Sequence, residues 1–291
     1  MKFEKTEVWG FEHALRGMRN PKESWSKSDS CLCSEMICAK CSQNKDDGYE
    51  CSLGGRIDFA IGKNDMELAQ KLIRAGSVHR KFMRQIFVSV DITAPLYWWK
   101  EFDTYKVGTV ANSTSTMHKL ASTPITRECF EMDDFENVEI DMSVENFWES
   151  YLIPTLEQLR QLHNKNMELS KTPNITDQER KRLIVVAKKY WKELIRLLPE
   201  SWLQTRTVTM DYENLIGICS ADQRRNHKLS EWSKSFIGWA KSLPYANELL
   251  FVDKKREVDF VMGHENGVYK CKSNSGEEFE SVDGKTWEPI L

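Results

Sequence analysis

Apolar residues recur at helical spacing in the stretch between residues 68 and 75, which follows the polar run Asn64 to Glu67. Asn64 with Glu67 three positions later is a capping-box pattern, in which each side chain satisfies a backbone N–H that is unpaired at a helix start. Gly76 supplies a residue that adopts positive φ where a helix ends. The spacing therefore predicts a helix over residues 64–75.

The next segments alternate between strand and helix patterns. Apolar and polar side chains alternate along 85–92, which is typical of a half-buried strand. Pro95 opens a short aromatic helix, because proline is tolerated in a first turn. Residues 107–119 are rich in small and hydroxylated side chains and indicate a functional loop or an edge segment. A second strand is predicted over 205–210, and Asp211 after it is expected to cap a further helix.

Two long helices are predicted in the second half, and another near its end. Ser143 is expected to cap a run of apolar residues at helical spacing, with a kink at Pro154. Thr176 and Glu179 form a second capping box, which starts the next helix. Apolar positions within 229–243 predict the last long helix.

The two ends of the chain differ from this pattern. Residues 20–60 are polar and cysteine-rich, so we interpret them as an insertion. Short strand-like runs separated by Gly, Asn and Ser predict a small β-hairpin appendage over 255–291. The order of elements predicts an α+β domain over 1–254, with a mixed sheet packed against long helices.

Composition and charge exclude several classes of protein. Hydrophobic residues make up 40% of the chain and charged residues 29%, which is incompatible with global disorder. The formal charge of −3 argues against binding of extended duplex nucleic acid, though not of a single nucleotide. No window contains the roughly 18 apolar residues that span a bilayer. The charged first seven residues lack an apolar signal core, so we expect a cytoplasmic protein with no membrane partner.

The cysteines form the most specific short-range pattern in the sequence. Five of the eight lie between residues 31 and 51. Cys33, Cys38, Cys41 and Cys51 have a spacing that suits four tetrahedral Zn²⁺ ligands, with Cys31 as a substitute. Free thiols, an iron–sulfur cluster or disulfides are the alternatives. Any zinc would have a structural role and stabilise the insertion, because structural zinc sites are closed by four protein ligands.

The succession of elements over about 64–245 resembles the flavin-dependent thymidylate synthases. In that family a helix ending in glycine leads to a Pro-Phe-Glu-His segment, a strand and an Ala-Pro helix. An Arg-Gln-Trp-x-Arg-His-Arg stretch and a polar loop with Ser and Asn follow. This chain has Ala94-Pro95 and then the run 100–106, with Thr109 at the family's serine and Asn112 within one position of its asparagine. Later counterparts are Leu198-Pro199, Thr205-Arg206-Thr207, Asn214-Leu215 and the run from Arg224 to Lys228.

Other residues replace the charged motifs of the family in this chain. The Arg-His-Arg is replaced by Thr104-Tyr105-Lys106, and the histidine of Pro-Phe-Glu-His by Arg84. In the family these positions serve flavin, folate or nucleotide. The changes leave a lysine where a bidentate guanidinium would bind phosphate best.

The resemblance implies transfer of a one-carbon group to a pyrimidine deoxynucleotide such as dUMP. It also implies FAD, methylenetetrahydrofolate as the carbon donor, and sites assembled between the subunits of a homotetramer. The substrate- and cofactor-binding residues it points to are Arg84, Lys106, Thr109, Asn112, Ser113, Thr114, Ser115, Arg224, Arg225 and His227. Tyr97, Trp98, Trp99 and Tyr105 are candidates for stacking on a ring.

Plainer interpretations stay open. Basic clusters at helix ends are commonly solvated faces, the hydroxyl-rich loop is compatible with an ordinary turn, and at least one of Trp98 and Trp99 is expected to be core. The alternative function is a non-catalytic nucleotide-binding or interaction protein on the same scaffold.

Overall fold

A computed structural model describes residues 1–32, 59–132, 142–219 and 227–252, together with four short strands between 261 and 289. The predicted zinc ligands Cys33, Cys38, Cys41 and Cys51 lie outside the described residues, as do Arg224 and Arg225.

The centre of the fold is a four-stranded sheet in the order β1-β4-β6-β5. Its strands are β1 (Lys2–Trp9), β4 (Phe87–Pro95), β5 (Val110–Ser113) and β6 (Leu203–Asp211). Every pairing is antiparallel, so the expectation of a mixed sheet is wrong in this respect. β4 and β6 pair along their whole lengths, from Phe87 opposite Asp211 to Pro95 opposite Leu203.

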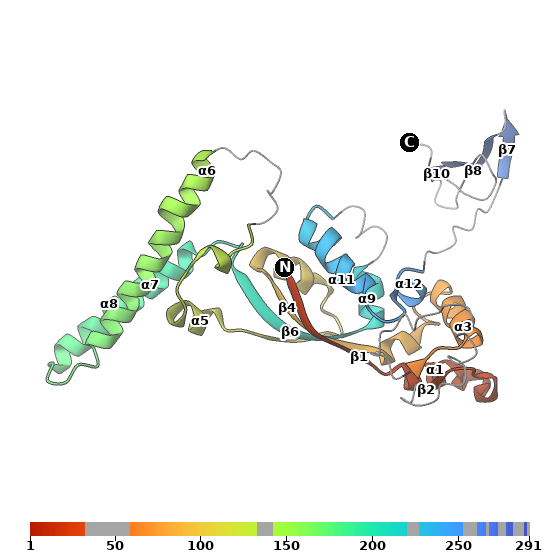
Figure 1. Cartoon of the computed structure of the whole chain (residues 1–291), viewed down its shortest axis with the longest axis horizontal. Coiled ribbons are helices and arrows are strands. Elements are labelled where there is room, and N and C mark those ends of the chain that lie inside the picture. Colours follow the sequence, from red (N-terminus) through yellow and green to blue (C-terminus); the bar gives the residue numbers. More distant parts are fainter. Residues whose placement is uncertain are drawn as a thin grey trace, which may run out of the picture.

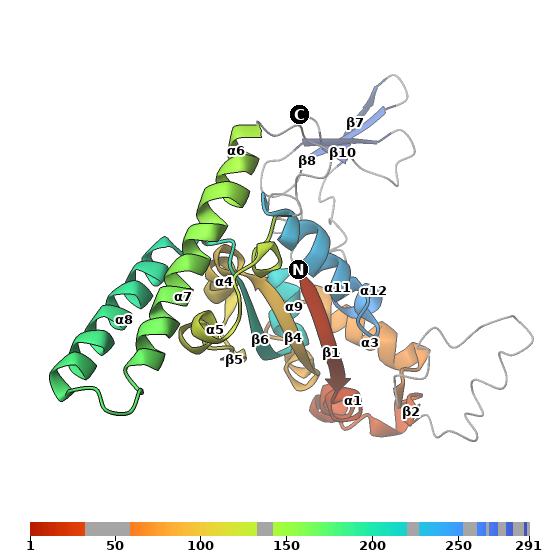
Figure 2. The same cartoon turned by 60° about the vertical axis from the view of Figure 1, so that its left-hand side comes forward.

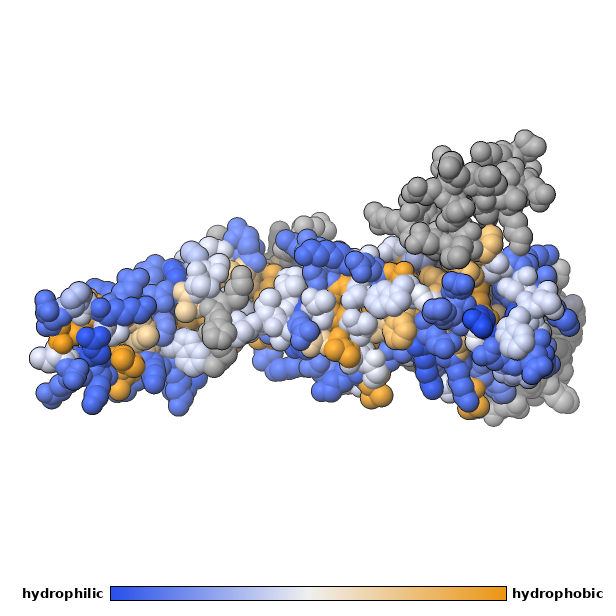
Figure 3. All heavy atoms as spheres, turned by 90° about the horizontal axis from the view of Figure 1, so that it is seen from below, coloured by the Kyte–Doolittle hydropathy of each residue, from blue (hydrophilic) through white to orange (hydrophobic). Residues whose placement is uncertain are grey.

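The two faces of this sheet have opposite character. Val88, Val90 and Ile92 point to one face and are at most 1% exposed, which is the alternation expected of a half-buried strand. On the other face, hydroxyl groups of neighbouring strands bond to each other, as between Ser89 and Thr209 at 2.9 Å. No described helix lies over this second face, and Figure 3 views the molecule from that side.

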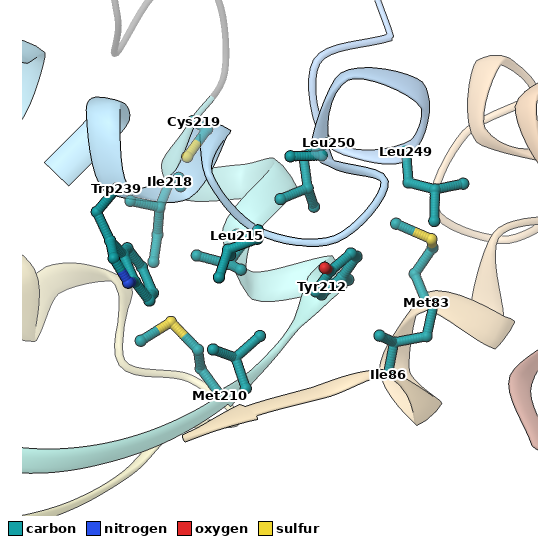
Figure 4. Packing of buried hydrophobic residues seen from close by; sticks show 14 of the residues in the cluster. Met83, Ile86, Met210, Tyr212, Leu215, Ile218, Cys219, Trp239, Leu249 and Leu250 are labelled. Carbon is teal, nitrogen blue, oxygen red and sulfur yellow. The ribbon is translucent and has the colours of Figure 1, made fainter. Parts of the chain in front are cut away.

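Helices cover the apolar face of the sheet (Figure 1). They are α1 (Phe11–Arg19), α3 (Lys63–Arg74), α4 (Leu96–Phe102), α9 (Tyr212–Ile218), α11 (Ile237–Lys241) and α12 (Ala246–Leu249), with a π-helical turn η9 (Glu231–Phe236) running into α11. Figure 4 shows side chains from β6, α9, α11 and α12 meeting in one core around Tyr212 and Leu215. This core fixes α9 and η9 relative to the sheet.

Helix caps follow the sequence in two of four cases. Thr176 accepts a hydrogen bond from the N–H of Glu179 and starts α8 (Asp177–Leu197), as predicted. Asp211 and Asn214 form a capping box at the start of α9. The Asn64 capping box is wrong, because α3 begins at Lys63 and the carboxylate of Asp29 accepts from the N–H groups of Asn64 and Asp65 instead.

A long helical hairpin extends from the end of the sheet (Figures 1 and 2). Its first arm runs through α6 (Met142–Phe147), a π-helical turn over Trp148–Leu152 and α7 (Ile153–Leu169), and its second arm is α8. Ser143 lies inside α6 rather than capping it, and the irregular turn immediately precedes Pro154. A second apolar cluster, which includes Leu156, Leu194 and Trp202, joins the hairpin to the body.

The base of the cysteine-rich segment is anchored by a buried ion pair. The Nε of Arg19 donates to Asp65 at 2.5 Å, and these residues are 5% and 0% exposed. The hydroxyls of Ser28 and Ser30 also donate to Asp65. Beyond them the two-residue strand β2 (Cys31–Leu32) pairs with β3 (Phe59–Ala60), so the chain leaves and re-enters the described structure at one place.

The chain ends in a separate antiparallel sheet of order β10-β9-β8-β7. Its strands are β7 (Val261–Glu265), β8 (Val268–Lys272), β9 (Glu278–Ser281) and β10 (Glu288–Pro289). They fall within the segment for which short strands were predicted. Within the described ranges, no helix is both long and apolar enough to cross a bilayer.

Candidate functional site

Helix α4 carries the aromatic run of the sequence, and its two tryptophans are core residues. Trp98 and Trp99 are both 0% exposed. Trp98 packs among Phe102, Trp232 and Phe236, and the indole N–H of Trp99 donates to the backbone carbonyl of Gln204 at 2.9 Å. Neither ring is open to a solvent-borne ligand, so the stacking role suggested for them is wrong. They fix α4 on the sheet.

The segment after α4 turns back sharply toward β5. A 3₁₀ turn, η5 (Asp103–Tyr105), leads to Lys106, and Gly108 takes a φ of +84°. The N–H and hydroxyl of Thr109 both donate to the carbonyl of Lys106, at 2.9 and 2.8 Å. The side chain of Lys106 is exposed. Lys106 and Thr109 therefore lie in one tight turn.

The hydroxyl-rich run Asn112–Ser115 belongs mainly to an edge strand. Asn112 lies opposite Thr207 and Ser113 opposite Arg206 in the β5–β6 pair, and the N–H of Thr114 donates to the carbonyl of Thr205 at 2.8 Å. The run from Asn112 to Ser115 is exposed. Because the N–H of Thr114 is used by the sheet, it is not available to bind an anion.

Arg84 lies beside the start of α9, on the 3₁₀ turn η4 (Lys81–Gln85). Burial raises the pKa of Asp211, and the positive charge of Arg84 partly offsets that rise. Asn214, the partner of Asp211 in the capping box, donates to the carbonyl of Val107 at 2.6 Å. The capping box thus links the surroundings of Arg84 to the Lys106–Thr109 turn.

His227 lies on the other flank of α4. Its ring stacks on Trp232 with centroids 4.8 Å apart, and its Nε2 is 3.4 Å from the Glu101 carboxylate. The hydroxyl of Tyr105 also donates to Glu101 at 3.4 Å. His227 therefore brings the end of the 224–228 run against α4 and η5. In this position the His227 ring lies beside the carboxylate of Glu101.

Arg206 on β6 is the functional candidate that sequence reasoning missed. Its guanidinium carbon is 4.2 Å from the centre of the Trp99 ring. Its Nε donates to Gln204 at 3.0 Å and its Nη1 to Asp103 at 3.1 Å. The available signal was its place in Thr205-Arg206-Thr207, where the family match directed attention to the threonines.

The cations of this region are largely neutralised by carboxylates. Arg206 pairs with Asp103, and Arg80 with Glu213 at 2.7 Å. Among the described residues Lys106 and Arg84 have no carboxylate partner, and both are exposed. In the part of the chain that the structure describes, no group of three or more His, Cys, Asp or Glu side chains is arranged to hold a metal.

Comparison with known proteins gives a structural match only. No protein-family model matches the sequence, and no curated protein is similar enough to be matched. A crystal structure of thymidylate synthase X (ThyX) from Helicobacter pylori with FAD and dUMP is similar over 88% of this chain and 100% of its own, with a TM-score of 0.53 and 15% identity. A second structure of flavin-dependent thymidylate synthase ThyX from Helicobacter pylori, complexed with FAD and dUMP, covers 86% and 98% with a TM-score of 0.49 and 15% identity. The chain has the fold of the flavin-dependent thymidylate synthases.

Proposed function

We propose that this chain binds a pyrimidine deoxynucleotide together with FAD and transfers a one-carbon group to the pyrimidine. The similar structure holds FAD and dUMP. The observation that carries the proposal is the gathering of the Lys106–Thr109 turn, Ser113, Arg206 and His227 around α4 and β5.

The residues present fit a flavin nucleotide in their donor chemistry. The exposed ammonium of Lys106 and the hydroxyl of Ser115 suit a diphosphate, because charge-assisted hydrogen bonds to phosphate are stronger than neutral ones. Arg84 is a second exposed cation near the same turn. When bound, reduced flavin supplies the hydride for the one-carbon transfer. Methylenetetrahydrofolate is the carbon donor that the proposal implies.

The chain's own residues bind and orient in this scheme. Lys106 and Arg84 compensate the negative charge of phosphate groups. Ser113 lies opposite Arg206 and Asn112 opposite Thr207, so the two side chains project to opposite faces of the sheet and only the Ser113 hydroxyl shares a face with Arg206. The buried aromatic cluster under α4 keeps that helix fixed while ligands exchange.

Binding of FAD and dUMP tests the proposal directly. We expect purified protein to be yellow, or to bind FAD with micromolar affinity and to gain thermal stability when dUMP is added. Replacing Lys106 by Ala should weaken FAD binding about tenfold, since one charge-assisted contact contributes about 1.5 kcal/mol. Lys181 on the exposed surface of α8 is a matched control, and Lys181→Ala should bind FAD normally. A colourless, folded protein that binds neither FAD nor dUMP would contradict the proposal.

A second candidate is nucleotide binding or partner binding without catalysis. It is favoured by the pairing of Arg206 with Asp103 and of Arg80 with Glu213, which leaves fewer free cations for a transition state. The discriminating measurement is product formation by mass spectrometry after incubation with dUMP, reduced flavin and folate. Binding without product supports this candidate, and deletion of 20–60 or 255–291 should then abolish partner binding but leave the core folded.

Two further proposals concern assembly and metal. We propose a homotetramer, which light scattering coupled to size-exclusion chromatography tests, with a strict monomer as the contradicting result.

We also propose that Cys33, Cys38, Cys41 and Cys51 hold one Zn²⁺. Native mass spectrometry should detect one zinc per chain, lost in Cys38→Ser. A zinc-free wild-type protein purified without chelators would contradict this proposal.

A further inference from the structure

The second arm of the helical hairpin carries charge of one sign. Residues 180–192 contain six basic side chains and no acidic one, although the whole chain has a formal charge of −3. This run lies within α8, in the part of the molecule that projects away from the sheet (Figure 2). The positive charge is therefore concentrated on an element that lies apart from the candidate site around α4 and β5.

The packing of α8 leaves its lysines on the solvent side. Ala187 and Leu194 are 0% exposed, and the carbonyl of Ala187 lies 2.9 Å from Nδ1 of His163 on α7. These two positions are seven residues apart, so they share the helix face that is turned toward α7. The exposed lysines of the run lie away from that face and are Lys181, Lys188, Lys189 and Lys192.

These four lysines, which we call the lysine row, are not neutralised by carboxylates. Glu179 lies 3.5 Å from Arg182 and Glu193 pairs with Arg196, so the acidic groups near the two ends of the run are used by arginines. In the described part of the chain, none of the four lysines forms an ion pair. At a rise of about 1.5 Å per residue, the lysine row extends over about 16 Å of helix.

The side chains around the lysine row indicate which polyanion it suits. Val185, at 53%, is the one exposed large hydrophobic side chain within 180–192. Protein interfaces are enriched in aromatic residues and arginine and are poor in lysine. A helix that lies in a membrane surface needs a broad apolar face to bury, which this face of α8 lacks. A phosphate backbone requires only positive charge, and the compact ammonium of lysine binds phosphate without a fixed geometry.

We propose that the lysine row of α8 binds the phosphodiester backbone of a nucleic acid. The row offers no exposed aromatic ring on which a base could stack, so the contact is made with phosphates and is independent of base sequence. Its length matches about five base-pair steps of a duplex, at about 3.4 Å per step. This surface is separate from the residues proposed to bind FAD and dUMP.

Fluorescence anisotropy with labelled oligonucleotides of mixed sequence, one single-stranded and one duplex of equal length, tests this surface at increasing salt concentration. In the triple variant Lys188→Gln, Lys189→Gln, Lys192→Gln we expect the affinity at low salt to fall by about tenfold or more. The slope of log affinity against log salt should decrease by about 0.9 per lysine for the duplex, or about 0.7 for the single strand. The strand form that binds the wild type more tightly identifies the source of the backbone.

The matched control removes the same charge elsewhere. Lys22, Lys63 and Lys71 are exposed at the far end of the molecule, around α1 and α3, and their joint replacement by Gln should leave affinity and slope unchanged. An equal loss in both triple variants would overturn the assignment to α8, because net charge alone would then explain it. Absence of oligonucleotide binding by the wild type at low salt would also overturn it, as would binding to phosphatidylserine vesicles alone.

Two further measurements separate this surface from folding and from the proposed function. Melting temperatures of both triple variants should equal that of the wild type, because exposed substitutions rarely change stability. FAD affinity should be the same in all three proteins. A protein that binds oligonucleotides through the lysine row but not FAD would contradict the proposed function and leave the lysine row supported.

Discussion

The buried ion pair between Arg19 and Asp65 gives the sharpest prediction about stability. In Asp65→Ala the guanidinium of Arg19, which is 5% exposed, loses its carboxylate partner. The hydroxyls of Ser28 and Ser30 lose their acceptor in the same change. Removal of one partner from a buried pair destabilises a protein by about 3–5 kcal/mol, because an uncompensated charge stays in a poorly solvated place.

This magnitude is a large part of the total stability. A folded domain is typically stable by about 5–15 kcal/mol, so Asp65→Ala should lower the free energy of unfolding by about a fifth or more. Glu193→Ala is the matched control, because Glu193 pairs with Arg196 on an exposed helix face, with side chains 49% and 57% exposed. The loss of that pair should change the free energy of unfolding by less than about 0.5 kcal/mol.

Urea denaturation followed by tryptophan fluorescence, at neutral and acidic pH, measures the effect. Burial would raise the pKa of Asp65, but the hydrogen bonds from Ser28, Ser30 and Arg19 together lower it. A group with a lowered folded-state pKa contributes stability above its unfolded pKa and loses it as the pH falls through the folded value. The difference between wild type and Asp65→Ala should therefore shrink in acid. A difference below about 1 kcal/mol at neutral pH would refute the reasoning.

Three further predictions follow from local structure. Hydrogen bonds from Arg160 outweigh burial and lower the pKa of Glu157 from 4.5 to about 2, so Glu157→Gln should be less stable than wild type at neutral pH, with the gap closing as the pH falls from about 4.5 to 2 in denaturation curves. Thr176→Ala removes the cap of α8 and should lower the free energy of unfolding by about 1 kcal/mol, whereas Thr176→Ser should leave it nearly unchanged. Gly10 has a φ of +98° and a Cβ there would lie 2.1 Å from the carbonyl oxygen of Gln85, so Gly10→Ala should destabilise by about 2 kcal/mol or more, and a wild-type melting temperature would contradict this.

The elements that sequence predicts well are those whose signal is local. The alternation along β4 and the caps at Thr176 and Asp211 depend only on neighbouring residues, and the structure confirms them. The start of α3 was misassigned because its cap, Asp29, is supplied from 34 positions before Lys63 in the sequence. A capping-box pattern cannot reveal a competitor from a distant segment.

The candidate site was only partly predictable for the same reason. The resemblance points to Lys106 and Thr109 as ligand-binding residues, which stays a prediction, while the tight turn that joins them is visible only in the structure. Arg206 was not selected, because its importance depends on Asp103 and Trp99, which tertiary packing brings to it. The burial of Trp98 and Trp99 likewise depends on η9 and β6, which lie more than a hundred residues further along the chain.

A crystal structure of the protein with FAD and dUMP tests the central claim most directly. The account predicts a pyrimidine nucleotide beside α4, with phosphate near the Lys106–Thr109 turn. A nucleotide bound away from both α4 and β5, or no bound ligand at saturating concentration, would contradict it.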